Sequence, residues 1–193
     1  MYKILFASLF ASLLFTGCST EHKTEISEHT KSGMRNNANE FMSVLKNVLV
    51  SEIQQNGLAA AVSVCSDTAQ IMTNNYSMEK GVFLKRVSTK NRNENNSPDP
   101  FETEGLKYFQ KILNEGNLDS LTEYYGIVEK SEIKYIRYMK PIIVQAPCLN
   151  CHGMKEQIIP EVLDIIQNRY KNDKAINYQL GELRGAVSIQ KVY

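Results

Sequence analysis

Hydrophobic and polar positions divide this chain into an apolar start, a polar stretch and a long patterned region. Residues 4–15 form an apolar run that follows the positive charge of Lys3 and is interrupted only by small residues. The run is too short to span a bilayer and is typical of an export signal. From Ser19 to about Gly33 the chain is polar and charged without periodicity, which predicts a flexible tether.

A helical pattern begins at about Met34 and ends at Asn56-Gly57, a pair that favours a helix end. Its apolar residues recur at spacings of three and four: Phe41, Val44, Leu45, Val48, Leu49 and Ile53. A second helical stretch runs from Leu58 to about Tyr76. We therefore expect a hairpin or a bent pair of helices at the start of the domain.

The rest of the chain alternates between strand-like and helix-like segments. In order, they are a strand at 82–89, a loop of turn formers at 91–100, a helix at 102–113, a hairpin of strands at 121–128 and 133–144, an amphipathic helix at 156–170 and a closing strand at 185–192. We expect these helices and strands to belong to one folded unit, over residues 34–193. Its length suits one domain with its own core.

Charge changes this picture little. The 193 residues carry a formal net charge of +1, and no basic stripe is present, so we expect no nucleic-acid partner.

The chemistry is concentrated between Pro147 and Gly153, where two cysteines three positions apart are followed by a histidine. Covalent haem attachment requires this arrangement, because both thiols add to the haem vinyl groups and the adjacent imidazole ligates the iron. Cys148 and Cys151 are thus the expected thioether residues, and His152 is the expected axial ligand. One covalently held haem c is the predicted cofactor.

Three other roles for this motif are weaker. A structural zinc site needs a second ligand pair at similar spacing, which the chain does not offer. A thioredoxin-like dithiol does not need the adjacent His152. A disulfide between Cys148 and Cys151 would close too small a loop to constrain the unfolded chain much.

The end of the apolar run, Leu14 to Ser19, resembles the bacterial lipoprotein signal, in which Cys18 becomes the acylated first residue. The expected organisation is a signal peptide at 1–17, a tether at 18–33 and the haem domain at 34–193. Acyl chains on Cys18 would anchor the protein to a membrane. A serine after the acylated position, as at Ser19, resembles the pattern of lipoproteins sorted to the outer membrane. We therefore expect a location in the cell envelope, facing the periplasm. Covalent haem attachment also takes place outside the bacterial cytoplasm.

Three further residues are candidates for the same site. Cys65 is neither the lipid cysteine nor part of the haem motif, and it suits either a buried packing position or an iron ligand. Arg86 and Arg92 are candidate partners of a haem propionate, because guanidinium matches carboxylate geometry. The alternative for Arg92 is a simple surface loop.

The order of these motifs resembles the Tll-type haem domains, a family described as PAS-like c-haem sensors. The resemblance rests on Ala61 to Ala69 around Cys65, Arg86 to Ser88, Asn91 to Asn93 with Asn96 and Pro98, Pro141, Cys148 to Gly153, and Gly185 to Ser188. It implies a PAS-like α+β domain over residues 34–193, with an antiparallel sheet and flanking helices. It also implies that Cys65 occupies the axial position opposite His152.

Two functions remain. In a haem-based redox or ligand sensor, loss or exchange of the Cys65 ligand would change the contacts of its helix. In a one-electron carrier between membrane-bound redox partners, both ligands would stay in place. We favour the sensor, with a redox or signalling protein as partner. An enzyme is not expected, because a peroxidase-like site would need an open iron position and a distal acid or base.

Overall fold

The computed structural model describes residues 25–193. The helices are α1 (Glu28–Lys80), α2 (Pro100–Asn114), α3 (Leu149–His152) and α4 (Pro160–Arg169), and the strands are β1 (Phe83–Val87), β2 (Tyr124–Lys130), β3 (Ile133–Ile143) and β4 (Leu183–Val192). Short 3-10 turns cover Glu94–Asn96, Ala146–Cys148 and Lys155–Gln157. The predicted α+β class is confirmed, and so is the hairpin of β2 and β3.

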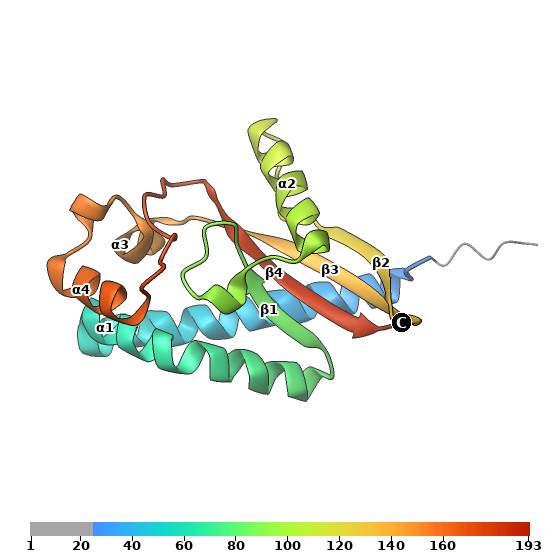
Figure 1. Cartoon of the computed structure of the whole chain (residues 1–193), viewed down its shortest axis with the longest axis horizontal. Coiled ribbons are helices and arrows are strands. Elements are labelled where there is room, and N and C mark those ends of the chain that lie inside the picture. The colour runs from blue at the N-terminus through green and yellow to red at the C-terminus, as the bar shows by residue number, and fades with distance from the viewer. Residues whose placement is uncertain (1–24) are drawn as a thin grey trace, which may run out of the picture.

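The four strands form an antiparallel sheet in the order β1-β4-β3-β2. Helix α1 runs along one face of this sheet, and α2 lies on the other (Figure 1). Successive side chains along each strand point to opposite faces of the sheet. In β3, Tyr138 packs with Phe41 of α1, while the next residue, Met139, packs with Leu106 and Phe109 of α2.

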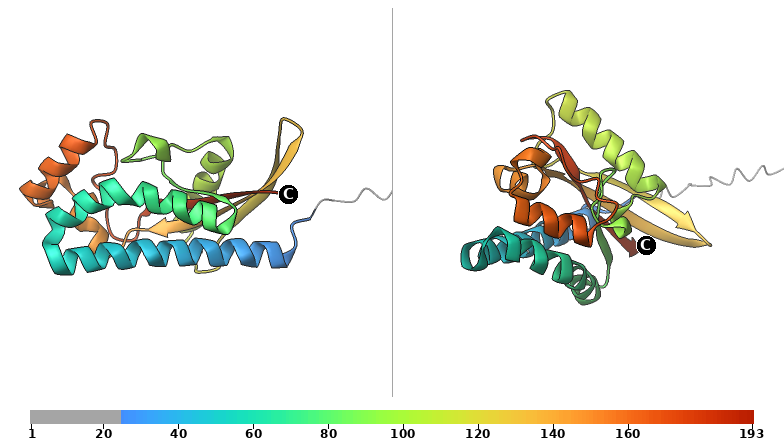
Figure 2. Two further views of the ribbon diagram at one scale, coloured as in Figure 1. Left: turned by 90° about the horizontal axis from the view of Figure 1, so that it is seen from below. Right: turned by 60° about the vertical axis from the view of Figure 1, so that its left-hand side comes forward.

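Helix α1 consists of two antiparallel halves, as Figure 2 shows. They are joined at Gly57, whose φ of 83° and ψ of 175° lie outside the helical region. The positive φ suits glycine, which has no Cβ to clash there. The rings of Phe41 and Tyr76 meet at 5.4 Å, and the Tyr76 hydroxyl donates to Glu40 at 2.9 Å. The predicted helical hairpin is therefore present; we call residues 58–80 the return half of α1.

The structure differs from the sequence-based expectation at the start of α1. The helix begins at Glu28 instead of Met34, within the segment predicted as tether. Ser27 caps it by accepting a hydrogen bond from the Thr30 amide at 3.2 Å, a local feature that apolar periodicity does not reveal. Cys18 and the predicted signal peptide lie outside the described residues. Within residues 25–193, no helix is long and apolar enough to cross a membrane.

Candidate functional site

The cysteine-histidine motif lies at one end of the sheet, directly after β3, where α3 and α4 gather beside the turn of α1 (Figure 1). A 3-10 turn followed by one turn of α-helix carries Cys148, Cys151 and His152. Gly153 ends this helix, and a Cβ there would lie 2.6 Å from the carbonyl oxygen of Leu149. The close turn after the motif therefore requires glycine. Neither cysteine of the motif forms a disulfide.

The His152 side chain is held by one hydrogen bond. Its Nδ1 lies 2.7 Å from the carbonyl oxygen of Ala175. A carbonyl only accepts, so this bond places the proton on Nδ1 and leaves the lone pair on Nε2. Burial, with the charges of Arg184 and Arg92, holds the pKa of His152 well below its ordinary value. The imidazole is thus neutral, as a metal ligand must be.

The segment 173–178, which we call the clamp, is hydrogen-bonded to the motif through its backbone. The Tyr178 amide donates to the His152 carbonyl at 2.9 Å, and the Asn177 amide donates to the Gly153 carbonyl at the same distance. The Tyr178 ring also meets the imidazole edge-on, with ring centroids 6.3 Å apart. Sequence reasoning missed this segment, because it has neither helical nor strand periodicity.

Arg92 braces both sides of this clamp. Its guanidinium donates to the carbonyl oxygens of Cys151, at 2.6 Å, and Ala175, at 3.2 Å. It also pairs with Asp173 at 3.2 Å. Arg92 is therefore engaged with the backbone that positions His152, and its role at a propionate stays a prediction.

Cys65 lies on the return half of α1, half-buried and without a disulfide partner. Burial raises the pKa of its thiol, and the positive charge of Arg86 opposes that rise. Burial likewise raises the pKa of Cys151, and the nearby Cys65 thiol raises it further. The two thiols thus share one electrostatic neighbourhood, and Cys151 packs against the apolar cluster of Val62 that joins α1 to α4.

The residues next to Cys65 are tied to α4. Arg169 donates to the Ser66 hydroxyl at 2.6 Å and forms an ion pair with Asp67. Because α4 follows the motif in the chain, the Cys65 segment and the motif are connected through a single short helix.

Two arginines complete the site. Arg86 projects from β1, and its Nε is buried without a hydrogen-bond partner in the described structure. Burial and the like charge of Arg184 lower the pKa of Arg86. Arg184, at the start of β4, was not predicted as a site residue; it stands directly before the Gly185–Ser188 stretch and gave no pattern of its own.

A protein-family comparison extends over almost all of this structure. The family model described as Tll0287-like matches residues 21–191. The chain belongs to the Tll0287-like family. The resemblance drawn from the sequence motifs is thereby confirmed.

A solved relative supports the fold of this Tll0287-like chain. The crystal structure of the cyanobacterial haem-protein Tll0287 superposes with a TM-score of 0.64 at 20% sequence identity. The match covers 86% of this chain and 97% of that chain. No curated protein matches the sequence.

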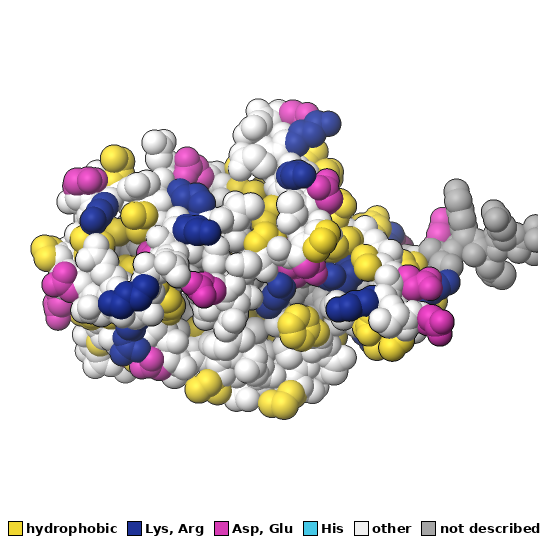
Figure 3. Space-filling view, viewed as in Figure 1, with side chains coloured by type: hydrophobic (Ala, Val, Ile, Leu, Met, Phe, Trp, Pro, Cys, Tyr) yellow, Lys and Arg dark blue, Asp and Glu magenta, His cyan; other side chains and the backbone are white. Residues whose placement is uncertain are grey.

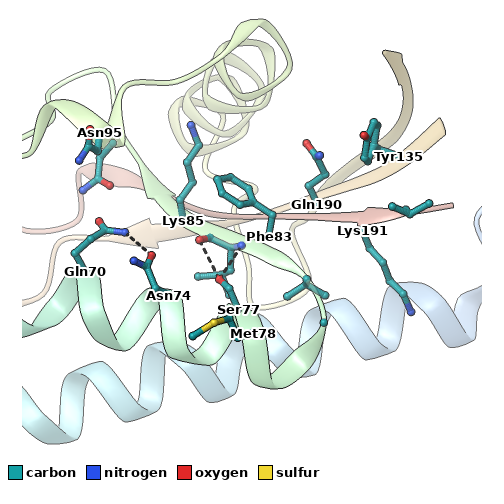
Figure 4. Close-up of a pocket in the computed structure, with 15 residues that line it drawn as sticks. Gln70, Asn74, Ser77, Met78, Phe83, Lys85, Asn95, Tyr135, Gln190 and Lys191 are labelled. Carbon is teal, nitrogen blue, oxygen red and sulfur yellow. Dashed lines mark hydrogen bonds between the residues drawn. The ribbon is translucent and has the colours of Figure 1, made fainter. Parts of the chain in front are cut away.

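A separate groove of about 730 Å³ lies between the return half of α1 and strands β1 and β4 (Figure 4). It is lined by Asn74, Phe83, Lys85 and Gln190, among others, and by none of the motif residues. Ser77, which lines this groove, accepts a hydrogen bond from the Leu84 amide and donates one to the Leu84 carbonyl, so it satisfies part of the β1 edge. On the face drawn in Figure 3, basic and acidic side chains are interspersed. Among residues 25–193, no group of three or more His, Cys, Asp or Glu is arranged to hold a metal ion.

Proposed function

We propose that this Tll0287-like protein binds one haem covalently and uses it as a redox or ligand sensor in the cell envelope. Cys148 and Cys151 would form the two thioether bonds, and His152 and Cys65 would ligate the iron. Support for the cofactor comes from the family, from the haem-protein of the same fold, and from the chemistry of these side chains.

The observation that carries the proposal is the bond between His152 Nδ1 and the Ala175 carbonyl. Histidines that ligate metals usually donate their other ring N–H to such an oxygen, which fixes the ring and its tautomer. With Nε2 unprotonated and the thiols of Cys148 and Cys151 unpaired, the donor set fits a covalently held haem. When bound, the haem would supply a one-electron couple, and exchange of the Cys65 ligand would allow a small molecule to bind.

Sensing is favoured by the place of Cys65. Its neighbours Ser66 and Asp67 contact Arg169 of α4, while Val62, one turn earlier, packs into the α4 cluster. A change in what Cys65 binds would alter these contacts and so the packing of α1 against α4. Ligand exchange would thus be read as a change in helix packing, which a signalling partner can recognise.

Electron transfer is the second candidate, and one observation favours it. The motif is clamped by the amides of Asn177 and Tyr178 and by Arg92, so the His152 side of the site is rigid. A rigid ligand changes little between two oxidation states, which suits a carrier that works between membrane-bound redox partners.

The proposed location follows from Cys18. Acylation of this residue would anchor the domain to a membrane, and several chains hold far more firmly than one. We place the protein at the outer membrane, facing the periplasm, with a redox or signalling protein as partner.

The test is haem staining on a denaturing gel, which detects only covalently held haem. The wild-type chain should give a stained band, and Cys148→Ala with Cys151→Ala should give none. Cys65→Ala is the matched control, because it removes a thiol that forms no thioether; its band should persist. A normal band from the double variant would refute the attachment residues.

A further inference from the structure

Arg86 and Arg184 are half-buried guanidinium groups without a carboxylate partner in residues 25–193. The Nε of Arg86 has no hydrogen-bond partner there. Arg184 donates to the Lys90 carbonyl at 3.2 Å and lies 5.3 Å from the centre of the Tyr178 ring. Both lie close enough to His152 for their charges to lower its pKa.

The other enclosed arginines of the described fold show what these two lack. Arg35 pairs with Glu123, Arg137 pairs with Asp99 and Glu102, and Arg92 pairs with Asp173. Buried charges are ordinarily paired, because an isolated one is costly. Burial and mutual repulsion lower the pKa of Arg86, and burial lowers that of Arg184. The positive charges of Arg86 and Arg184 are therefore not neutralised by a carboxylate within residues 25–193.

Arg184 lies at an irregularity in the pairing of β3 with β4. Strand β3 pairs Ile142 with Gly185 and Ile143 with Leu183, so the register skips Arg184. Such a bulge turns a side chain away from the regular alternation of a strand. The carbonyl of Arg184 accepts the Ser88 hydroxyl at 2.8 Å, which fixes the bulge against the end of β1. Arg86 lies two residues before Ser88, so both arginines belong to the same corner of the sheet.

We propose that Arg86 and Arg184 together form the receptor for the two propionate carboxylates of the haem, whereas Arg92 positions the motif. This inference rests on the proposed function. A haem carries two carboxylates, and guanidinium groups bind carboxylates with paired hydrogen bonds. The Tyr178 ring contacts His152 and lies beneath Arg184, so one side chain links the iron ligand to the anion receptor.

The first test measures the midpoint potential of the haem-loaded full chain against pH, in Arg86→Gln and Arg184→Gln. An arginine pair holds the propionate pKa low, so the wild-type potential should vary little between about pH 5 and 8. Loss of either arginine should raise the propionate pKa. The potential should then fall as pH rises, because an ionised carboxylate favours the oxidised iron. Arg184→Gln is the cleaner variant with respect to Cys65, since Arg86 contributes to the pKa of Cys65 and Arg184 does not.

The second test compares denaturation midpoints with and without haem. In the loaded chain, Arg86→Gln and Arg184→Gln should lower the midpoint. In the full chain with Cys148→Ala and Cys151→Ala, which carries no covalent haem, the same substitutions should leave it unchanged or raise it, because they remove repulsion. Arg92→Gln is the matched control and should lower the midpoint in both forms, since its backbone and Asp173 contacts do not involve haem.

The outcomes separate the two proposals. A wild-type chain without a haem-stained band would remove the proposed function itself. A stained wild type whose Arg184→Gln variant keeps a flat potential–pH curve would overturn the propionate receptor alone. Equal destabilisation of loaded and unloaded chains would do the same, because it would show a purely structural arginine. If the unloaded chain does not fold, the potential–pH curves decide.

Discussion

His152 and Ala175 lie 23 positions apart in sequence, and their bond of 2.7 Å fixes which imidazole nitrogen is free. The Ala175 carbonyl also accepts from Arg92 at 3.2 Å, so the oxygen that orients the histidine is itself held by a charged donor. The tautomer of His152 is therefore a property of the folded domain. A short motif supplies the proposed ligand, and a distant irregular segment fixes its tautomer.

His152→Ala should separate attachment from ligation. In the proposed site the thiols hold the haem ring and the imidazole binds the iron, so the haem band on a denaturing gel should persist while the ferric absorption spectrum changes. The control is His29→Ala, since His29 is exposed in the first turn of α1, remote in sequence from the motif. An unchanged spectrum in His152→Ala, or an equal change in both variants, would contradict the ligand assignment.

Glu123 should make the free energy of unfolding depend on pH in the acid range. Its burial opposes ionisation, but hydrogen bonds from Arg35 and Tyr138 outweigh this and lower the pKa of Glu123. A lowered carboxylate pKa stabilises the fold above the unfolded value of about 4.3, and the effect is lost as pH falls through the folded pKa. Glu123→Gln should cost about 2–4 kcal/mol at pH 7, measured by denaturant unfolding.

The same experiment repeated at lower pH checks the sign. The stability difference between wild type and Glu123→Gln should stay constant down to about pH 5 and shrink below about pH 4. Glu129→Gln is the control, since Glu129 is exposed on β2, and it should change stability by less than about 0.5 kcal/mol. A difference that grows on acidification would refute the role given to Glu123.

Gly185→Ala should disrupt the corner that presents Arg184. A Cβ at position 185 would lie 2.2 Å from the Val87 carbonyl oxygen, and the φ of 155° is one that side chains rarely adopt. The backbone of β1 or β4 must then shift, so we expect a loss of more than about 2 kcal/mol in unfolding free energy. The matched control is Gly33→Ala, where no atom lies within 4 Å of the added Cβ. Equal stability of the two variants would contradict this packing.

Local patterns made much of this protein predictable. Three- and four-residue spacing identified the halves of α1, and period-two segments identified β2 and β3. The motif at Cys148–His152 was visible because its chemistry lies in adjacent residues. What the sequence did not reveal depends on long-range contacts: the Ala175 carbonyl is backbone in an irregular segment, and Arg184 is presented by a bulge. The sequence identified Arg92 as a candidate site residue, but only the folded structure shows its hydrogen bond to the Cys151 carbonyl.

Cys18→Ala should release the protein from the membrane fraction, or leave it with an uncleaved signal. In the proposed lipoprotein, acylation requires this thiol, and without acyl chains the anchor would be lost. Metabolic labelling with a fatty acid measures the effect, with Cys65→Ala as the control that keeps Cys18. Equal labelling of wild type and Cys18→Ala would show that another residue, or none, carries the lipid.

Cys65→Ser should reveal the second axial ligand in the haem-loaded protein. If the Cys65 thiolate binds the ferric iron, wild type should be low spin with thiolate character. The serine variant should shift towards high spin and show a raised midpoint potential, because a strong anionic donor is gone. If Cys65 only packs in the helix, the substitution should lower stability by about 1–3 kcal/mol and leave spectrum and potential unchanged.

Ser63→Ala, two positions earlier on the same helix, controls for disturbance of α1 and should alter neither spectrum nor potential. An unchanged ferric spectrum in Cys65→Ser would transfer the sixth position to a methionine. Met139 is a poor substitute, because it is fully buried between α2 and the sheet with Leu106 and Phe109. The remaining candidates would be Met72 and Met154, and a neutral thioether that stays bound in both oxidation states would favour the electron carrier over the sensor.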